Sequence, residues 1–315
     1  MVKVAIIGSG FVGRAWAISY ARAGHEVVLW DEQADAPAKA LSYVESVLPE
    51  LEANGLLNGA APAQIMGRIR GAATLEEALA GAAHVQENTF EDPEVKRAVF
   101  ARLDAAAGPD TVLASSTSAI LPSVFTESLA GRARCLVAHP INPPYLVPVV
   151  EVVPAPWTDP EVVARTTEFL RGADHSPVVM KRELDGFLIN RMQGALLEEA
   201  FRLVADGYAS VEEVDVCIRE GLALRWSFMG PFETIDLNAP GGVRDYAQRF
   251  DPMFDRFFRS AQWRVDWKGP VMDAIEAQRR ERLPADALQA RQAWRDRRLM
   301  ALAAHKRRAD KEIGR

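Results

Sequence analysis

The sequence predicts an α/β protein in two parts. A mostly parallel β-sheet covered by helices is expected over residues 1–184, followed by an all-helical domain over residues 185–315. Short apolar segments alternate with helical segments through the first half of the chain, as in sheets built from β-α-β units. A glycine-rich loop joins the first apolar segment to the first helix. Beyond Leu184 the strand signals end, and apolar residues recur at helical spacing.

The predicted strands are short and mostly apolar, without the alternation of a half-exposed sheet. Such runs are typical of parallel strands that helices cover on both faces. They lie at residues 4–7, 27–30, 84–87, 111–114, 135–138 and 149–153. Helices are expected between them: Gly24 ends the first, and Asp92 before Pro93 is a typical helix start. This order predicts a sheet of the Rossmann type.

The second domain is predicted from a change of period. Leu188, Met192, Leu196 and Leu203 recur at helical spacing, and Ser210 with a glutamate three residues later resembles a capping box. The last segment, residues 291–315, is rich in arginine and lysine. It is interpreted as a solvated helix face in preference to a binding patch.

Composition excludes several classes of function. The chain has 315 residues, 49% hydrophobic and 25% charged, as in ordinary globular enzymes, and its net charge of −6 gives no reason to expect nucleic acid or a membrane surface as partner. No apolar run is long enough to span a membrane.

Cys135 and Cys217 both sit among apolar residues and are expected to be buried, reduced thiols. Their spacing suggests no metal site, and a cytoplasmic location is the default expectation.

The glycine-rich loop predicts a dinucleotide site. Its six residues are Gly8, Ser9, Gly10, Phe11, Val12 and Gly13. Gly8 permits a tight turn, Gly10 lets a pyrophosphate approach the backbone, and Gly13 lets the helix pack close to the strand. The N–H groups at the start of the helix, at Phe11 and Val12, face the phosphates. An ordinary strand–helix turn is the alternative, but the flanking strand and helix favour the ligand site.

Asp31 indicates which dinucleotide is used. It ends the second strand, about 20 residues beyond the loop, where a carboxylate accepts hydrogen bonds from the ribose 2′-hydroxyl. The same carboxylate repels a 2′-phosphate. Glu32 and Gln33 follow it, and no arginine stands there to receive NADP. The predicted cofactor is therefore NAD.

His139 and Glu151 are the candidate catalytic pair. Ligands of such sheets sit at the carboxyl ends of the strands, and residues 115–118 and 139–144 place polar groups there. A histidine suits the base that an alcohol oxidation needs. A carboxylate on the next strand would orient the imidazole. The alternatives are a structural histidine and a surface glutamate of an edge strand, but a charge within the apolar run 149–153 would be costly unless paired.

These residues resemble a known family. Ser118, His139, Glu151 and Asn190 match the constellation of the L-3-hydroxyacyl-CoA dehydrogenases in type and spacing, within the segments 116–118, 139–144 and 186–191. The resemblance covers essentially the whole chain. It is nearest to the lambda-crystallin and L-gulonate 3-dehydrogenase branch, through the segments 139–145, 220–225, 230–234 and 292–298.

The resemblance implies roles for these residues. His139 would take the proton of a substrate C3 hydroxyl, Glu151 would hold His139, and Ser118 and Asn190 would hydrogen-bond the reacting oxygen. Asn190 begins the helical domain, so the site is expected in a cleft between the domains. The family also implies a homodimer through the helical domain, with which the aromatic run 250–267 is compatible.

Two further cofactor contacts are implied by the resemblance alone. Glu91 and Lys96 would touch NAD. From the sequence alone, both would be interpreted as solvated charges near a helix start.

The substrate is predicted to be a small 3-hydroxy acid. Residues 32–66, where the acyl-CoA enzymes contact the coenzyme, hold Lys39 as their only basic residue, which disfavours the phosphates of coenzyme A. Arg225 suits a free carboxylate, although it could equally be a structural or exposed arginine. L-Gulonate is the specific candidate from the resemblance.

Other functions stay open. A 3-hydroxyacyl-CoA substrate is one, with basic groups supplied from elsewhere in the chain. A carnitine substrate is another, if a tryptophan binds its quaternary ammonium by cation–π contact. The candidates for that contact are Trp16, Trp226 and Trp263. A non-catalytic, crystallin-like protein and an NAD-binding sensor rank below these, because Ser118, His139, Glu151 and Asn190 are all present.

Overall fold

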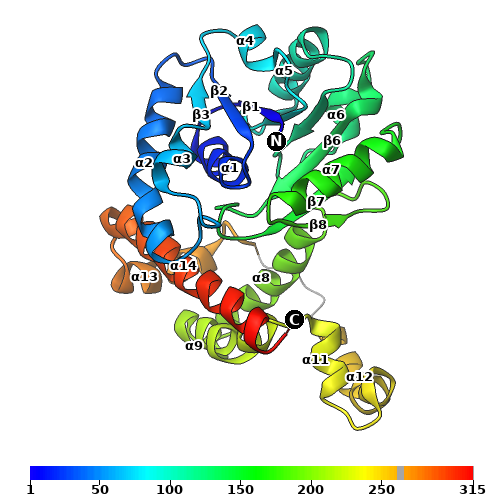
Figure 1. Cartoon of the computed structure of the whole chain (residues 1–315). Helices are drawn as coiled ribbons and strands as arrows, with labels where there is room; N and C mark the ends of the chain where they lie inside the picture. The colour runs from blue at the N-terminus through cyan, green and yellow to red at the C-terminus, as the bar shows by residue number, and fades with distance from the viewer. Residues whose placement is uncertain (261–265, 315) are drawn as a thin grey trace. The chain divides into compact units, whose positions relative to one another are not determined.

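The computed structural model describes residues 1–260 and 266–314. The chain divides into two compact units, and Figure 1 follows it from the blue N-terminus to the red C-terminus. The first unit consists of Met1–Leu188 and Arg295–His305, and the second of Ile189–Trp294 and Lys306–Arg315.

The first unit is built on an eight-stranded sheet in the order β3-β2-β1-β4-β5-β6-β7-β8. Its strands are β1 (Lys3–Ile7), β2 (Glu26–Trp30), β3 (Ile69–Gly71), β4 (His84–Glu87), β5 (Val112–Ser115), β6 (Cys135–Pro140), β7 (Val149–Pro154) and β8 (Ser176–Val179). Only β6 and β7 pair antiparallel. The six predicted strands are all present, whereas β3 and β8 were not predicted. The α/β fold with a mostly parallel sheet is confirmed.

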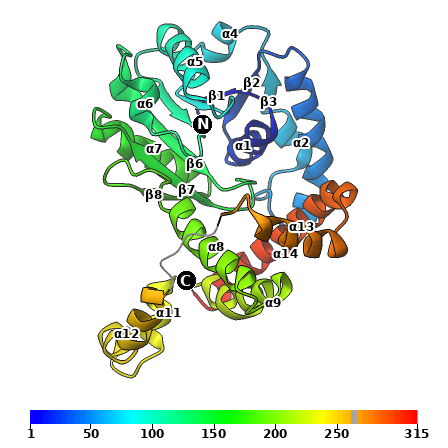
Figure 2. The same ribbon diagram turned by 180° about the vertical axis from the view of Figure 1, so that it is seen from behind.

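Helices cover both faces of the sheet (Figure 1), as the view from behind also shows (Figure 2). One hydrophobic cluster joins one face to α1 (Phe11–Arg22), α2 (Ala36–Ala53), α3 (Pro62–Met66) and α7 (Pro160–Gly172). A second cluster joins the other face to α4 (Leu75–Leu79), α5 (Pro93–Ala106) and α6 (Pro122–Thr126). The turn η1 (Arg132–Arg134) leads into β6.

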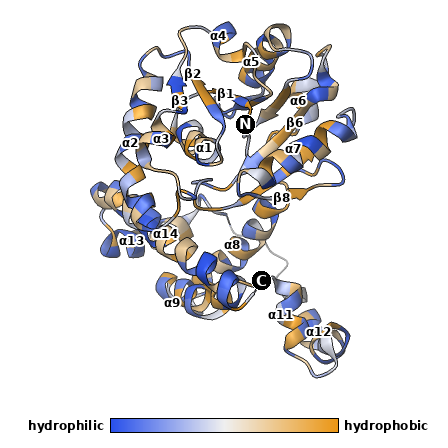
Figure 3. Ribbon diagram, viewed as in Figure 1, coloured by the Kyte–Doolittle hydropathy of each residue, from blue (hydrophilic) through white to orange (hydrophobic). Residues whose placement is uncertain are grey.

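Burial of the strands explains their composition. In Figure 3, β2 and β6 are largely hydrophobic, whereas α2 and α7 carry hydrophobic and hydrophilic residues on different sides. Trp16, Tyr20 and Phe100 reach the two clusters from the helices and are fully buried. Each large apolar side chain removed from water in this way stabilises the fold by about 1.5–3 kcal/mol. The carboxyl ends of the strands, next to which the candidate site lies, are therefore supported by a tightly packed core.

Local caps set where several helices begin. The Asp92 side chain accepts hydrogen bonds from the N–H groups of Glu94 and Val95 at the start of α5, with proline in the first turn. Thr74 caps α4 through the N–H of Glu77. The helix start at Asp92 was predicted. Both caps satisfy N–H groups that the first turn of a helix leaves free.

The described part of the second unit contains helices and no strand. These helices are α8 (Ile189–Ala205), α9 (Val211–Val216), the π-helical segment η2 (Cys217–Leu222), α10 (Ala223–Trp226), α11 (Pro231–Leu237), α12 (Gly242–Ser260), α13 (Pro270–Arg282), η3 (Ala285–Ala287) and most of α14 (Leu288–Glu312). The capping box of Ser210 and Glu213 at the start of α9 is present as predicted. Trp267 stacks on Phe201 with ring centroids 4.6 Å apart. The helical character of the C-terminal region is confirmed.

The C-terminal segment differs from its predicted place. Arg295–His305, expected in the second domain, clusters with the first unit. Met300 is 2% exposed within the first hydrophobic cluster, and Arg297 pairs with Glu50 of α2 at 3.0 Å. The reason is that Met300 of α14 is buried in this cluster, with Leu299 and Ala303 packed against it and partly buried.

The two cysteines also differ from each other. Cys135 is buried as predicted, and burial raises the pKa of its thiol to about 12, so that it stays protonated and unreactive. Cys217 is exposed, so its predicted burial is wrong. It begins the π-helical segment, and its apolar sequence neighbours do not enclose it. Both thiols are free.

Candidate active site

The glycine loop has the shape that a dinucleotide needs. Gly8 has φ of +89°, and a Cβ there would lie 2.8 Å from the Asn88 carbonyl oxygen. A Cβ on Gly13 would lie 1.9 Å from the carbonyl oxygen of Gly8, so α1 reaches the strand only with glycine at this position. A Cβ on Gly10 would meet no protein atom within 4 Å. The turn and the helix contact thus explain two glycines, and the third leaves space beside the helix N-terminus for phosphates.

Asp31 is tied to the same loop. Its Oδ2 accepts a hydrogen bond from the N–H of Ser9 at 2.7 Å, and its Oδ1 accepts one from the N–H of Gln33 at 3.0 Å. These bonds hold the carboxylate at the end of β2. Its remaining acceptor positions suit the hydroxyls of a ribose.

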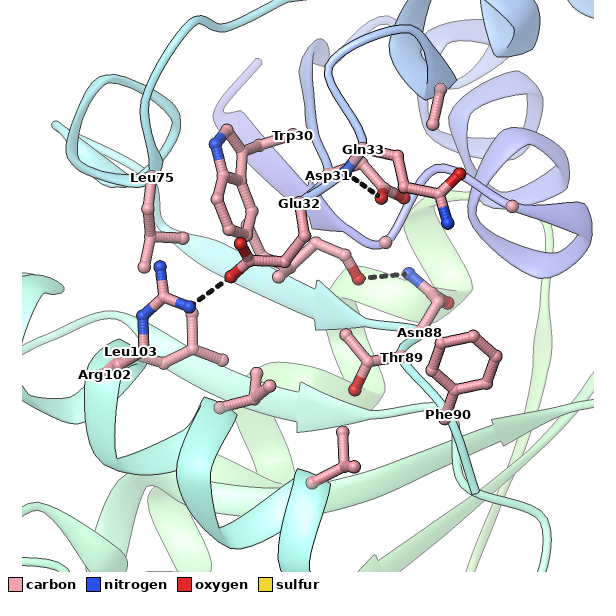
Figure 4. A pocket seen from close by; sticks show the side chains of 16 residues that line it. Trp30, Asp31, Glu32, Gln33, Leu75, Asn88, Thr89, Phe90, Arg102 and Leu103 are labelled. Carbon is pink, nitrogen blue, oxygen red and sulfur yellow. Dashed lines mark hydrogen bonds and ion pairs between the residues drawn. The ribbon is translucent and has the colours of Figure 1, made fainter. Parts of the chain in front are cut away.

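A pocket opens beside Asp31. It is lined by the glycine loop, the end of β2, the segment after β4 and one side of α5. Figure 4 shows Trp30, Leu75 and Phe90 around it, with Asp31, Glu32 and Arg102 among the labelled side chains. Apolar walls with a carboxylate at the rim suit an adenosine. The loop, the helix start and the pocket therefore fit NAD.

Arg102 lies near Asp31 in the folded chain, where the sequence suggested that no arginine stands. No arginine follows Asp31 in the sequence, but α5 brings Arg102 into the lining of the pocket, where it forms an ion pair with Glu32. Its guanidinium carbon also lies 5.4 Å from the centroid of the Trp30 ring. A cation therefore stands near the acidic end of β2 after all, with its charge opposed by Glu32.

Lys96 is buried, with its side chain 1% exposed. Its ammonium donates to Oε1 and Oε2 of Glu87 at 2.8 and 3.0 Å, and to the carbonyl oxygen of Thr89 at 3.1 Å. These bonds use its three donor hydrogens. Its interpretation as a solvated charge is wrong. Through these contacts Lys96 holds the segment after β4, and its contact with NAD stays a prediction.

Glu87, at the end of β4, is the centre of this arrangement. Besides Lys96, it accepts hydrogen bonds from the N–H and hydroxyl of Thr89, each at 2.5 Å, and from the hydroxyl of Ser115 at 2.6 Å. A buried carboxylate is tolerated because its charge is paired and its oxygens are hydrogen-bonded. The segment that lines the pocket is thereby fixed to β5.

Glu91 organises the loop after β5. Its Oε1 accepts hydrogen bonds from the Thr117 hydroxyl at 2.5 Å and from the N–H groups of Ser118 and Ala119 at 2.9 and 3.0 Å. Glu91 is exposed but engaged, so its carboxylate is not a purely solvated charge. It holds the backbone of Ser118 at the edge of the sheet.

A buried polar network behind this loop was missed by the sequence analysis. The amide of Gln86 donates to the hydroxyl of Ser116 at 2.7 Å, and the Trp16 indole donates to the same hydroxyl at 3.0 Å. Ser116 in turn donates to Oδ1 of Asn88 at 2.8 Å. Trp16 is fully buried and stacks on Tyr20, so it is a core residue with no free face for a quaternary ammonium. The available signal was the polar composition of β4, in which His84, Gln86 and Glu87 surround a single apolar residue.

His139 and Glu151 face each other across β6 and β7, where antiparallel pairing puts them in register. His139 Nδ1 lies 2.8 Å from Oε2 of Glu151, and Oε1 of Glu151 accepts the N–H of Leu188 at 2.7 Å. The histidine is 3% exposed and the glutamate is fully buried. A carboxylate at Nδ1 favours the imidazole tautomer that carries its proton there, with Nε2 as the acceptor. β7 lies between β6 and β8, so Glu151 is not on an edge strand.

Arg14 is a second residue that the sequence analysis did not single out. It follows Gly13, and its guanidinium carbon lies 3.7 Å from the ring centroid of Tyr43 on α2. Its Nε is buried without a hydrogen-bond partner, and among the described residues it forms no ion pair. The Tyr43 hydroxyl lies 2.9 Å from that of Tyr145. Burial is the main cause that raises the pKa of Tyr145, and the neighbouring Tyr43 is the next, so the phenol of Tyr145 stays neutral. Asp296, which also acts on the pKa of Tyr145, is paired with Arg295, and among the described residues no carboxylate forms an ion pair with Arg14 beside the glycine loop.

The remaining predicted residues belong to the second unit. Asn190 lies in the first turn of α8. Arg225 is exposed, and its guanidinium donates to Oδ1 of Asn238 at 3.3 Å, within α10 and the end of α11. Trp226 is 37% exposed. Trp263, the third tryptophan considered for a cation, lies outside the described residues.

No group of three histidine, cysteine, aspartate or glutamate side chains among the described residues is placed to hold a metal ion. No helix in the described part is both long and apolar enough to cross a membrane.

Comparison with known proteins places this arrangement in a family. Residues 3–183 match the NAD-binding domain of 3-hydroxyacyl-CoA dehydrogenase, and residues 186–269 match its C-terminal domain. Lambda-crystallin homolog from Bos taurus is 42% identical over 303 residues, which cover 95% of this chain and 94% of the relative. L-carnitine dehydrogenase from Streptomyces griseus is 41% identical over 251 residues, 79% of this chain and 74% of the relative.

A solved structure agrees with these relatives. The crystal structure of 5-formyl-3-hydroxy-2-methylpyridine 4-carboxylic acid 5-dehydrogenase, an NAD+-dependent dismutase, superposes with a TM-score of 0.82. It is 28% identical in sequence, and the match covers 96% of this chain and 97% of that one. The chain belongs to the 3-hydroxyacyl-CoA dehydrogenase family and is an NAD-dependent dehydrogenase that acts on a hydroxyl group.

Proposed function

We propose that the protein oxidises the 3-hydroxyl of a small 3-hydroxy acid that carries a free carboxylate, with L-gulonate as the specific candidate. The observation that carries the proposal is Arg14, a guanidinium without a counter-charge next to the NAD loop and in the same unit as His139. An anionic substrate group would supply that counter-charge. L-Gulonate comes from the resemblance to the lambda-crystallin and L-gulonate 3-dehydrogenase branch.

The cations around α2 support a small acid over a coenzyme A ester. Lys39 is paired with Asp35 at 2.6 Å, and Arg70 with Glu77 at 2.7 Å. Arg297, which α14 brings to α2, is paired with Glu50. Apart from Arg14, which contacts Tyr43 of α2, these paired cations offer little uncompensated positive charge to the phosphates of coenzyme A. Two similar proteins are also named after small acids: one after carnitine and the other after a pyridine carboxylic acid.

In the proposed mechanism, NAD supplies a hydride acceptor when it is bound. The N–H groups of Phe11 and Val12 would hold its pyrophosphate, and Asp31 its adenosine ribose. His139 accepts the hydroxyl proton at Nε2, and Glu151 stabilises the imidazolium that results. Ser118 and Asn190 are proposed to hydrogen-bond the reacting oxygen.

A substrate panel tests the proposal. NADH formation is measured with L-gulonate, L-3-hydroxybutyrate, L-carnitine and L-3-hydroxybutyryl-CoA. Turnover of a free hydroxy acid is expected to exceed that of the ester. His139→Gln should lower kcat by a factor on the order of 10²–10⁴, while NADH binding, followed by fluorescence, changes little. Reaction with the ester alone overturns the proposal, and NADH binding without any turnover favours the crystallin-like or sensor role.

The variants Arg14→Gln and Arg225→Gln test whether an arginine binds the carboxylate of the substrate. Loss of a charge-assisted hydrogen bond to the acid should lower kcat/KM about 10- to 100-fold. The methyl ester of the same acid, which has no charge, should not show this loss. Lys39→Gln, which removes an exposed and already paired cation, is the control. If neither arginine variant discriminates acid from ester, the free carboxylate is not what the enzyme recognises.

We also propose a cytoplasmic homodimer that pairs through the helical unit. The support is that none of the 17 residues of α8 is buried, although Met192, Leu196 and Leu197 are apolar. A second copy would cover such side chains. Sedimentation velocity should give a particle with twice the mass of the chain. In the variant Leu196→Glu, the measured mass should shift towards that of the monomer. The free thiols of Cys135 and Cys217 suit a reducing compartment.

A further inference from the structure

Three charged side chains stand at the rim of the adenosine pocket. Asp31 and Glu32 follow β2, and Arg102 comes from α5, 70 residues further along the chain from Glu32. Figure 4 shows Glu32 reaching across the pocket to Arg102, with the Trp30 ring beside them. Among the described residues that line the pocket, Arg102 is the only cation.

The two carboxylates have different partners. Asp31 accepts hydrogen bonds from the N–H groups of Ser9 and Gln33, so it is held by the backbone around it. Glu32 is held by Arg102. Arg102 is therefore not neutralised by the carboxylate that would contact the ribose, but by the neighbouring one.

This arrangement bears on the choice between NAD and NADP. An arginine near the end of β2 is the group that accommodates the 2′-phosphate in pockets for NADP. Arg102 could serve in that way, since a guanidinium binds phosphate through parallel hydrogen bonds. In this chain Glu32 occupies that guanidinium and adds a second negative charge to the one on Asp31. A 2′-phosphate would meet two carboxylates and a cation that is already paired.

We infer that Glu32 is a specificity-determining residue, which favours NAD over NADP by occupying Arg102. Asp31 acts directly on the ribose, and Glu32 acts by withholding the phosphate-binding cation. The inference concerns the NAD site and holds whichever hydroxy acid is the substrate.

The effect is expected in ligand choice and not in folding. The side chains of Arg102 and Glu32 are 51% and 67% exposed, and exposed pairs contribute little to stability. A free Arg102 should strengthen NADPH binding by about 1 kcal/mol, a factor of about 5. This gain in NADPH affinity should be larger when the repulsion from Asp31 is also removed. It should be smaller at high salt, because ions screen exposed charges.

The test measures the Kd of NADH and NADPH by fluorescence titration, so no substrate is needed. Glu32→Gln should lower the NADPH Kd about 5-fold and leave that of NADH within about 2-fold. The double variant Asp31→Ser/Glu32→Gln should favour NADPH further. Adding Arg102→Gln to Glu32→Gln should abolish the 5-fold gain of that single variant, which would show that the gain depends on Arg102.

A matched control is available on the same helix. Glu94→Gln breaks the exposed ion pair of Glu94 with Arg97, outside the pocket lining, and should leave the ratio of the two Kd values unchanged. The inference is overturned if Glu32→Gln leaves that ratio unchanged in a protein with native circular dichroism. It is equally overturned if the gain persists without Arg102, because general loss of negative charge would then explain it.

Discussion

His139 and Glu151 form a cross-strand pair, with Nδ1 of the imidazole 2.8 Å from Oε2 of the carboxylate and both side chains buried. Since β6 and β7 run antiparallel, the sheet register itself sets this geometry. The orientation of the His139 ring thus depends on the pairing of two strands.

Glu151→Gln should therefore act on catalysis through His139. Without the carboxylate, neither the tautomer nor the imidazolium is stabilised, and kcat should fall by a factor on the order of 10²–10⁴. Steady-state kinetics with NADH binding as control checks this. Retention of more than about a third of wild-type kcat would contradict a catalytic role for the pair.

Gly10→Ala and Gly13→Ala should separate ligand binding from folding. A Cβ at position 10 meets no protein atom, so the free energy of unfolding should change by less than about 1 kcal/mol while NADH affinity falls. A Cβ at position 13 collides with the Gly8 backbone, so both stability and affinity should fall. Urea unfolding and NADH titration measure the two effects. Equal destabilisation by both variants would be inconsistent with the loop geometry.

The pair of Glu87 and Lys96 is expected to behave as a coupled unit. Lys96→Met leaves a buried carboxylate without its cation and should lower the free energy of unfolding by about 3–5 kcal/mol. The double variant Glu87→Gln/Lys96→Met should lose less than the sum of the single losses. Urea denaturation of the four proteins gives the cycle, and additive losses would argue against a direct interaction.

Two buried histidines should make the protein less stable in acid. Burial lowers the pKa of His84 to about 4, and that of His175 likewise to about 4. Both groups are neutral in the fold, and their unfolded pKa is near 6.5. Their contribution is therefore complete above pH 6.5 and is lost as the pH falls towards 4.

The double variant His84→Gln/His175→Gln isolates this effect. Between pH 7 and pH 5 each histidine should contribute a loss of about 2 kcal/mol in the free energy of unfolding. The variant should therefore lose less stability over that interval than the wild type, whatever its stability at pH 7. An unchanged difference between the two pH values would show that other groups dominate the acid sensitivity.

The local parts of the site could be predicted from the sequence. A strand, a glycine loop, a helix and Asp31 follow one another closely, and the requirement for glycine at position 13 comes from the nearby Gly8 backbone. His139 and Glu151 could be paired because adjacent strands and one buried charge leave few alternatives. The cap at Asp92 and the capping box at Ser210 are local in the same sense.

By itself, then, the sequence determined the α/β class, the glycine loop for NAD and the pairing of His139 with Glu151, since short-range patterns encode them. Only the tertiary structure decided that Lys96 is buried against Glu87, that residues 295–305 join the sheet domain, and that Arg102 stands opposite Glu32. The physical reason is that these contacts join segments far apart in the chain. Their charges look solvated in sequence, and only packing shows which of them are paired.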